Sequence, residues 1–185
     1  SIMDEREIWV PHSLNEKFII LSQLDSSVSE SGTTNGQFYQ TLGNGLSGKL
    51  GAVTIKVDSN NPYRYIGSIF QSNSADYQDL ELVLHEGIFC NNDYYDGEVN
   101  CPKYFIDSNT LTLPAIKDLT FNPEKYYKIL FVTYRSHNNS AFYGSADENS
   151  FSGGESTRIN GDGAEVDPSV IEDLYFVITS RTAIR

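Results

Sequence analysis

Residues 125–135 read KYYKILFVTYR, and this stretch determines the fold class. Side chains alternate between two faces along a strand. One face would carry Tyr127, Ile129, Phe131, Thr133 and Arg135, and the other Tyr126, Lys128, Leu130, Val132 and Tyr134. Apolar groups in the middle of both faces are typical of a central strand in a packed sheet. A helix is the alternative for a short apolar run, but abundant Tyr, Phe and β-branched residues favour a strand.

Short apolar or alternating runs recur along the chain and predict further strands. They are residues 18–24, 38–42, 49–57, 65–70, 80–85, 104–106, 110–113, 117–121 and 173–179. Strict alternation would place Leu80, Leu82 and Leu84 on one face. Residues 25–37 are polar and predict a turn region. Residues 136–169 predict either an exposed loop system or turns flanking small strands.

Many short strands separated by turns predict an all-β fold. The expected architecture is an antiparallel two-sheet β-sandwich, with a jelly roll as the preferred topology. A chain of 185 residues is long enough for one such domain. Residues 18–185 are assigned to this domain. Residues 1–17 show no clean period and are assigned to an N-terminal arm or linker.

The charge and hydropathy of the chain exclude two classes of partner. With 13 basic and 25 acidic residues the net charge is −12, which repels phosphate backbones, so no nucleic-acid partner is expected. No run approaches the roughly 20 apolar residues of a membrane span, so no membrane insertion is expected. The chain begins at Ser1 without a start Met or an apolar signal region. This indicates an excised piece or a mature form, and part of a larger multidomain surface protein is one expectation.

The two cysteines, Cys90 and Cys101, bracket a short polar loop. A hairpin disulfide explains the pair better than a metal site, which would need further Cys or His nearby. Closing so short a loop would stabilise the fold by about 2 to 3 kcal/mol in the chain-entropy model. The expected location is therefore oxidising, either secreted or at the cell surface, and the alternative is two free thiols in a cytosolic protein.

Three segments, LTFNPEKYYKILFVTY, SAFYGSADENSFSGGES and DLYFVIT, carry a resemblance to a known type of domain. The order of a Phe-ending strand, a Tyr-containing central strand, Tyr-Gly and Gly-Gly turns and a closing Asp-Leu strand resembles secreted bacterial jelly-roll β-sandwich modules. The upstream QFYQTLGNGLSGKLGAVTIKV resembles the opening of such modules. These domains are similar to carbohydrate-binding modules, often appended to glycoside hydrolases or surface proteins. The matching residues belong to strands and turns, so the resemblance implies a fold more than an activity, and the cysteine loop departs from it.

No catalytic motif supports an enzyme. The histidines His12, His85 and His137 lie far from the cysteines and show no zinc-binding spacing. No GxSxG nucleophile motif is present. Paired carboxylates could form a glycosidase, but most acids lie in polar turns, where they keep ordinary pKa values and make the surface soluble. A jelly-roll polysaccharide hydrolase or lyase is therefore only an alternative.

The segment NGDGAEVD at residues 160–167 predicts a structural Ca²⁺ site. It offers hard oxygen ligands on a flexible turn, which Ca²⁺ requires. The candidate ligands are Asn160, Asp162, Glu165 and Asp167. The segment does not fit the EF-hand register, because Arg158 falls at the first ligand position. An ion-free acidic turn is the alternative, and no other cofactor is expected.

Sugar recognition requires aromatic faces for pyranose C–H groups and planar polar side chains for hydroxyls. One candidate region contains Tyr134, Arg135, His137, Asn138, Asn139 and Tyr143. Another is the cysteine hairpin, with Tyr94, Tyr95, Asn91, Asn92 and Asp93. Tyr63 and Tyr65 around Arg64 form a third cluster. The alternative for each is that the Tyr rings only cover the sandwich core.

The expected function is a non-catalytic, secreted or cell-surface carbohydrate-binding module that recognises a glycan or polysaccharide through Tyr, Asn and Arg in its loops. This expectation combines aromatic and amide-rich loops with the absence of a catalytic motif. A structural or adhesive module of a surface layer, fibre or phage particle is the alternative from another class.

Overall fold

The computed structural model describes residues 16–32, 37–57, 64–90, 110–115, 117–134, 140–159 and 170–184. Within these ranges the chain is all β, and every paired ladder is antiparallel. In chain order the elements are a 3-10 helix η2 (Glu16–Phe18), β1 (Ile19–Gln23), β2 (Val28–Gly32), β3 (Gln37–Gly43), β4 (Gly48–Lys56), β5 (Arg64–Ser72), β6 (Glu81–Cys90), β7 (Thr110–Pro114), β8 (Thr120–Phe121), β9 (Tyr126–Tyr134), β10 (Ser140–Ser145), β11 (Ser156–Ile159), β12 (Asp173–Leu174) and β13 (Phe176–Ser180).

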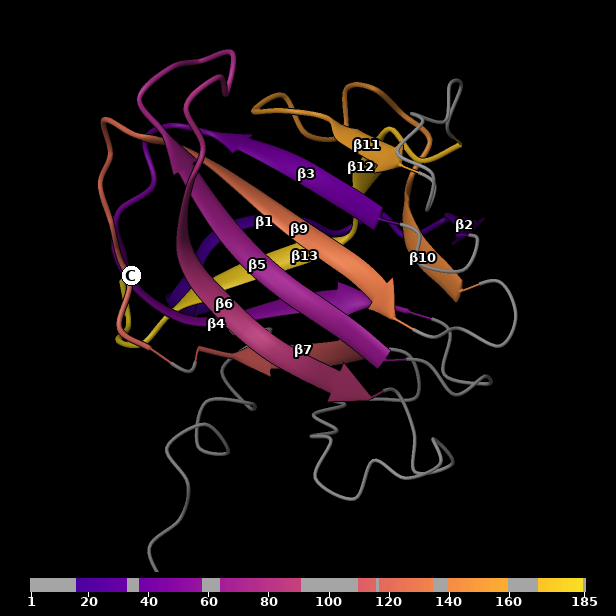
Figure 1. The fold of residues 1–185 in the computed structure, drawn as a ribbon, viewed down its shortest axis with the longest axis horizontal. Helices are drawn as coiled ribbons and strands as arrows, with labels where there is room; N and C mark the ends of the chain where they lie inside the picture. The colour runs from indigo at the N-terminus through magenta and orange to yellow at the C-terminus, as the bar shows by residue number, and fades with distance from the viewer. Residues whose placement is uncertain are drawn as a thin grey trace, which may run out of the picture.

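The strands form a β-sandwich, as the sequence predicts. In Figure 1 the sheet with order β11-β3-β9-β5-β6, here called the front sheet, lies over the back sheet with order β1-β13-β4-β7, in which β8 also pairs with β4. A smaller sheet, β12-β10-β2, lies at one end of the sandwich. The jelly-roll topology stays a prediction. So does the boundary at residue 17, because residues 1–15 lie outside the described ranges.

Strand β9 is central in the front sheet, between β3 and β5, which confirms the prediction made from residues 125–135. Tyr127, Ile129 and Phe131 are buried on its inner face. The side chains of Tyr126 and Lys128 on its outer face are only half-buried. The two faces of this strand therefore differ, because the inner one forms core and the outer one stays partly open.

Aromatic rings from different strands fill the core between the layers. Phe142 of β10 is 1% exposed, and its ring centroid lies 4.9 Å from that of Phe38 and 6.4 Å from that of Phe131. Phe121 meets Tyr127 edge-on at 4.8 Å. Rings at these distances add to the stabilisation from burial alone. They connect the smaller sheet and the front sheet through one hydrophobic cluster.

The prediction for residues 25–37 was wrong in part. Residues 25–37, expected to form a turn region, contain β2, which pairs with β10 through registers such as Ser29 with Tyr143. The sequence VSESG lacks an apolar alternation, so its local pattern does not predict a strand. The ladder to β10 forms the strand instead. Residues 136–169 contain β10 and β11, which agrees with turns flanking small strands.

Two predicted strands have different bounds in the structure. The run at 117–121 forms a strand only over β8, and the closing run divides into β12 and β13 at Tyr175.

The predicted common face for Leu80, Leu82 and Leu84 was also wrong. Ile69 pairs with Leu84 and its neighbour Phe70 pairs with Leu82, so the register of β6 shifts by one residue. In a regular strand, residues two apart lie on the same face, but a bulge between them places Leu82 and Leu84 on opposite faces. Leu84 is consequently buried at 2% exposure, whereas Leu82 is 53% exposed.

A buried carboxylate connects the front sheet to β12. Asp173 is 1% exposed, and its Oδ1 accepts a hydrogen bond from Gln40 Nε2 at 3.0 Å. Its Oδ2 accepts one from Ser150 Oγ at 3.0 Å. Gln40 Oε1 in turn accepts from the Leu174 amide at 2.9 Å. Burial raises the pKa of Asp173, and the hydrogen bonds from Gln40 and Ser150 offset only part of that effect.

The raised pKa of Asp173 predicts a specific dependence of stability on pH. The folded protein holds this proton more tightly than the unfolded chain, so the contribution of Asp173 is fully present below the ordinary pKa of 3.8 and is lost as the pH rises through the folded-state pKa. We therefore expect the free energy of unfolding of the wild type minus that of Asp173→Asn to fall as the pH rises. Urea denaturation from about pH 3 to about pH 6 measures this difference.

Asp25 provides the control with the opposite sign. Ser145 Oγ donates to Asp25 Oδ2 at 2.8 Å, and this bond lowers the pKa of Asp25. Its contribution is present above the ordinary carboxyl pKa and is lost as the pH falls through the lowered value. The difference between wild type and Asp25→Asn should thus fall toward acid. A difference for Asp173→Asn that does not change with pH would contradict the assignment.

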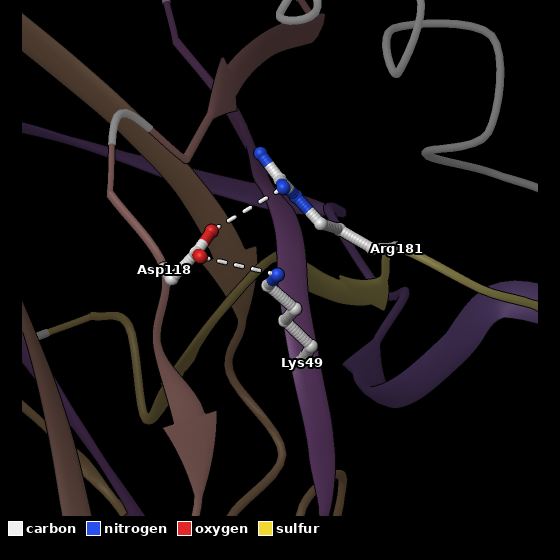
Figure 2. Close-up of polar contacts among 3 residues, drawn as sticks. All are labelled: Lys49, Asp118 and Arg181. Atoms are coloured by element: carbon white, nitrogen blue, oxygen red, sulfur yellow. Dashed lines mark hydrogen bonds and ion pairs between the residues drawn. The ribbon is translucent and has the colours of Figure 1, made fainter.

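A surface ion-pair cluster joins the back sheet to the segment before β8. Figure 2 shows the Asp118 carboxylate between Lys49 and Arg181, with Oδ2 3.2 Å from Lys49 Nζ and Oδ1 3.3 Å from Arg181 Nη1. The Asp118 side chain is 69% exposed, so each pair contributes about 1 kcal/mol or less. The Arg181 amide also donates to the Lys49 carbonyl at 2.9 Å, and this bond attaches the end of the chain to β4.

Candidate functional site

A pocket of about 510 Å³ opens where β3 ends and β9 begins. Its lining includes residues 75–77 of the loop between β5 and β6, and that loop is at the top of Figure 1. We call the cavity the Tyr77 pocket. Its lining residues are Thr41, Gly43, Ala75, Asp76, Tyr77, Tyr126, Gly153, Gly154 and Glu155. Segments far apart in the sequence therefore meet in one cavity.

Two tyrosine rings line the pocket at an angle to each other. Tyr126 lies at the start of β9, opposite Ser72 of β5. The loop that follows β5 returns over it, so the Tyr77 and Tyr126 ring centroids lie 6.1 Å apart at an interplanar angle of 82°. Both side chains are half-buried. An edge-to-face pair of this kind is a favoured aromatic arrangement, and each ring still borders the cavity.

Tyr77 is held in an unusual backbone conformation. Its φ is 57°, and within the described residues no other non-glycine has a positive φ. Left-handed conformations of this kind cost about 1 to 3 kcal/mol and are concentrated at functional sites. The Tyr77 amide donates to the Ser74 carbonyl at 3.1 Å, and its hydroxyl oxygen accepts from the Gly43 amide at 2.8 Å. Tyr77 is thereby held both at its backbone amide and at its hydroxyl.

The hydroxyl of Tyr77 belongs to the scaffold of the pocket. Burial raises the pKa of Tyr77, and the hydrogen bond from Gly43 only partly opposes this. The phenol therefore stays neutral at physiological pH. It presents an uncharged ring to the cavity while its oxygen holds the end of β3.

The wall opposite Tyr77 is the turn at residues 151–155, which is attached to β3. The Thr41 amide donates to the Glu155 carbonyl at 3.0 Å, and the Glu155 amide donates to Thr41 Oγ1 at 2.9 Å. The turn lies so close to β3 that there is no room for a side chain at Gly154. A Cβ there would overlap the Thr41 carbonyl oxygen and lie 2.5 Å from Thr41 Oγ1. Close packing thus requires glycine at position 154.

Two carboxylates complete the lining. Asp76 and Glu155 are both exposed. Ser74 Oγ donates to Asp76 Oδ1, which orients that carboxylate within the loop. No Lys or Arg lines the cavity among the described side chains. The pocket therefore offers two ring surfaces and anionic acceptors.

An open face continues from the pocket along the front sheet. Lys128, two residues after Tyr126, places its Nζ 3.6 Å from the centroid of the Tyr39 ring on the adjacent strand. Phe70 lies opposite Lys128 on the other side, and Leu82 lies opposite Phe70. Among the described side chains, this outer face mixes half-buried aromatic groups with the Lys128 cation.

Most of the residues predicted as sites lie outside the described ranges. Tyr143 is described, half-buried in β10, and it does not line the Tyr77 pocket. Tyr134 ends β9 and Cys90 ends β6. The predicted residues outside the described ranges are Tyr63, Asn91, Asn92, Asp93, Tyr94, Tyr95, Cys101, Arg135, His137, Asn138, Asn139, Asn160, Asp162, Glu165 and Asp167. The two sugar-binding loops, the disulfide and the Ca²⁺ site therefore stay predictions.

The sequence interpretation missed the Tyr77 pocket. Tyr77 lies in the polar run SNSADYQD, which reads as a simple connection. An aromatic residue within such a run, and the Gly-Gly pair at 153 and 154, were the available signals. Neither shows which segments meet, because the contact between Thr41 and Glu155 spans 114 residues.

In the described ranges no group of three or more His, Cys, Asp or Glu residues could hold a metal ion. The same part of the chain contains no helix that is long and apolar enough to cross a membrane. Comparison with models of known protein families finds no match to this chain, and comparison with curated proteins finds no relative.

Proposed function

We propose that this protein is a non-catalytic glycan-binding module whose ligand occupies the Tyr77 pocket. One observation carries the proposal: a pocket of about 510 Å³ on a β-sandwich is lined by two tyrosine rings, that of Tyr77 held through its hydroxyl, beside two carboxylates. This volume lies within the range of roughly 300 to 1,000 Å³ that small-molecule sites occupy. Rings of this kind accept pyranose C–H faces, and carboxylates accept hydroxyl protons.

Binding in this proposal breaks no bond. The sugar stacks on Tyr77 or Tyr126 and donates hydroxyl hydrogen bonds to Asp76 or Glu155. Because the Tyr77 ring is already held through its hydroxyl, it loses little side-chain entropy on binding. The open outer face would accommodate further sugar units of a longer chain. A secreted or cell-surface location, a jelly-roll topology, the Cys90–Cys101 disulfide and a Ca²⁺ at residues 160–167 belong to the same proposal.

Glycan arrays and titration calorimetry test this function. We expect binding to one class of oligosaccharide that strengthens with chain length, with no change in the ligand recovered afterwards. Tyr143→Ala should bind as the wild type does if the Tyr77 pocket is the site, and should bind more weakly if the loop after β9 is. A lack of binding across plant, microbial and host glycans would refute the proposal, and turnover of a polysaccharide would favour a hydrolase or lyase.

A structural or adhesive module is the second candidate, and exposed leucines at the margin of the front sheet favour it. Leu82 is 53% exposed and Leu80 is 43% exposed. Adjacent exposed leucines are typical of contact surfaces between proteins. Self-association seen by light scattering, lost in Leu82→Ser and accompanied by no glycan binding, would support this candidate.

A further inference from the structure

We infer that the Tyr77 pocket prefers glycans that carry a free amino group, such as β-1,4-linked glucosamine. This inference rests on the proposed function and specifies the ligand class. The cavity and its rings form the site, and the charges around them determine which sugar is preferred. The observations concern which polar groups of the lining remain available to a ligand.

Two hydroxyl groups of the lining, those of Tyr77 and Thr41, are already used within the protein. Tyr77 Oη accepts from the Gly43 amide, and Thr41 Oγ1 both accepts from the Glu155 amide and lies 3.2 Å from the Glu155 carbonyl. The charged groups of the lining are the exposed carboxylates of Asp76 and Glu155, which have several lone pairs each. Both are acceptors only, so the ligand must supply the donors. An ammonium supplies three.

Lys125 and Lys128, at and near the start of β9, make their described contacts outside the lining. Lys125 Nζ donates to Asn73 Oδ1, outside the pocket. Lys128 lies against the Tyr39 ring, on the open face beyond it. No lysine or arginine among the described side chains belongs to the lining. With a net charge of −12 on the whole chain, the potential around the cavity attracts cations.

Acidic sugars are disfavoured by the same charges. A uronic acid stacked on Tyr77 would place its carboxylate near Asp76 and Glu155, and like charges repel. A neutral N-acetylated sugar can still stack and donate hydroxyl protons. The expected order of affinity is therefore glucosamine oligomer, then N-acetylglucosamine oligomer, then galacturonate oligomer.

The test compares these three oligosaccharides, matched in length, by titration calorimetry with the intact protein. Each exposed carboxylate should favour the ammonium by about two- to fivefold, the size typical of exposed ion pairs. Asp76→Asn and Glu155→Gln should each weaken binding of the glucosamine oligomer more than binding of the N-acetylated oligomer, so that the glucosamine preference falls by that factor. Glu148→Gln removes an exposed charge that does not line the pocket and is the matched control. Raising NaCl from about 0.05 to about 0.5 M should reduce the preference in the wild type.

The outcomes separate this inference from the proposed function. Equal affinity for the charged and N-acetylated oligomers, or a preference that both pocket variants retain, would overturn the inference while glycan binding stands. Binding of none of the three oligomers, nor of any glycan on an array, would refute the proposed function itself. A lysine-rich peptide that binds as tightly as the glucosamine oligomer through the same carboxylates would also overturn the inference, because the sugar would then be irrelevant.

Discussion

Tyr77→Ala is expected to weaken glycan binding by about 30-fold or more, which is the effect of truncating an aromatic hot spot of roughly 2 kcal/mol. The ring is fixed by its hydroxyl and borders the cavity beside Tyr126. Alanine is preferred to glycine as the test residue because glycine would also relieve the backbone at φ 57° and alter the loop. Calorimetry with the best oligosaccharide from the array measures the loss.

Tyr77→Phe and Tyr143→Ala are the controls for this variant. The phenylalanine keeps the ring but leaves the Gly43 amide without its acceptor, so a loss of at most about tenfold is expected. Tyr143→Ala removes a half-buried ring elsewhere in the sandwich and should bind normally. If Tyr77→Ala bound with wild-type affinity while its circular dichroism and thermal unfolding were unchanged, the pocket would not be the binding site.

Phe142→Ala is expected to lower the free energy of unfolding by about 3 to 5 kcal/mol, as for other buried phenylalanines. Phe142 is 1% exposed and contacts the rings of Phe38 and Phe131 across the interface between β10 and the front sheet. Its backbone also forms an isolated bridge to Val57 at the end of β4. Removing the ring opens a cavity where all three sheets meet.

Urea denaturation of Phe142→Ala beside Phe70→Ala tests that result. Phe70 is half-buried on the outer face of β5, so its truncation should lower stability by only about 1 kcal/mol. If the two variants lost equal stability, or if Phe142→Ala unfolded in two separate steps, the smaller sheet would not share a core with the front sheet.

The fold class could be predicted because it depends on local pattern. Alternation over residues 125–135 identified β9, and the same reasoning identified β3, β4 and β5 within a few residues of their ends. It failed where a partner strand rather than the local sequence decides. β2 is polar and is fixed by β10, and the bulge that separates Leu82 from Leu84 arises in the pairing of β6 with β5. One local sequence does not encode either pairing.

The candidate site could not be predicted for a related reason. Periodicity assigned Tyr126 to the central strand but could not show that a polar loop would return over its outer face. The requirement for Gly154 depends on its contact with Thr41, on a strand more than a hundred residues away in sequence. The predicted sugar-binding residues, which are aromatic and amide side chains, lie together in short stretches of sequence. Sequence spacing identifies only residues that are neighbours along the chain.

The cavity exists only in the fully folded protein, because one of its walls depends on the hydrogen bonds between Glu155 and Thr41. A partly folded chain that has formed the β5–β6 hairpin but has not yet joined residues 41 and 155 lacks one wall of the cavity. Any molecule that occupies the cavity binds only the native state and so shifts the folding equilibrium of the whole sandwich. At a concentration one hundred times its dissociation constant, such a molecule would raise the free energy of global unfolding by about 2.7 kcal/mol.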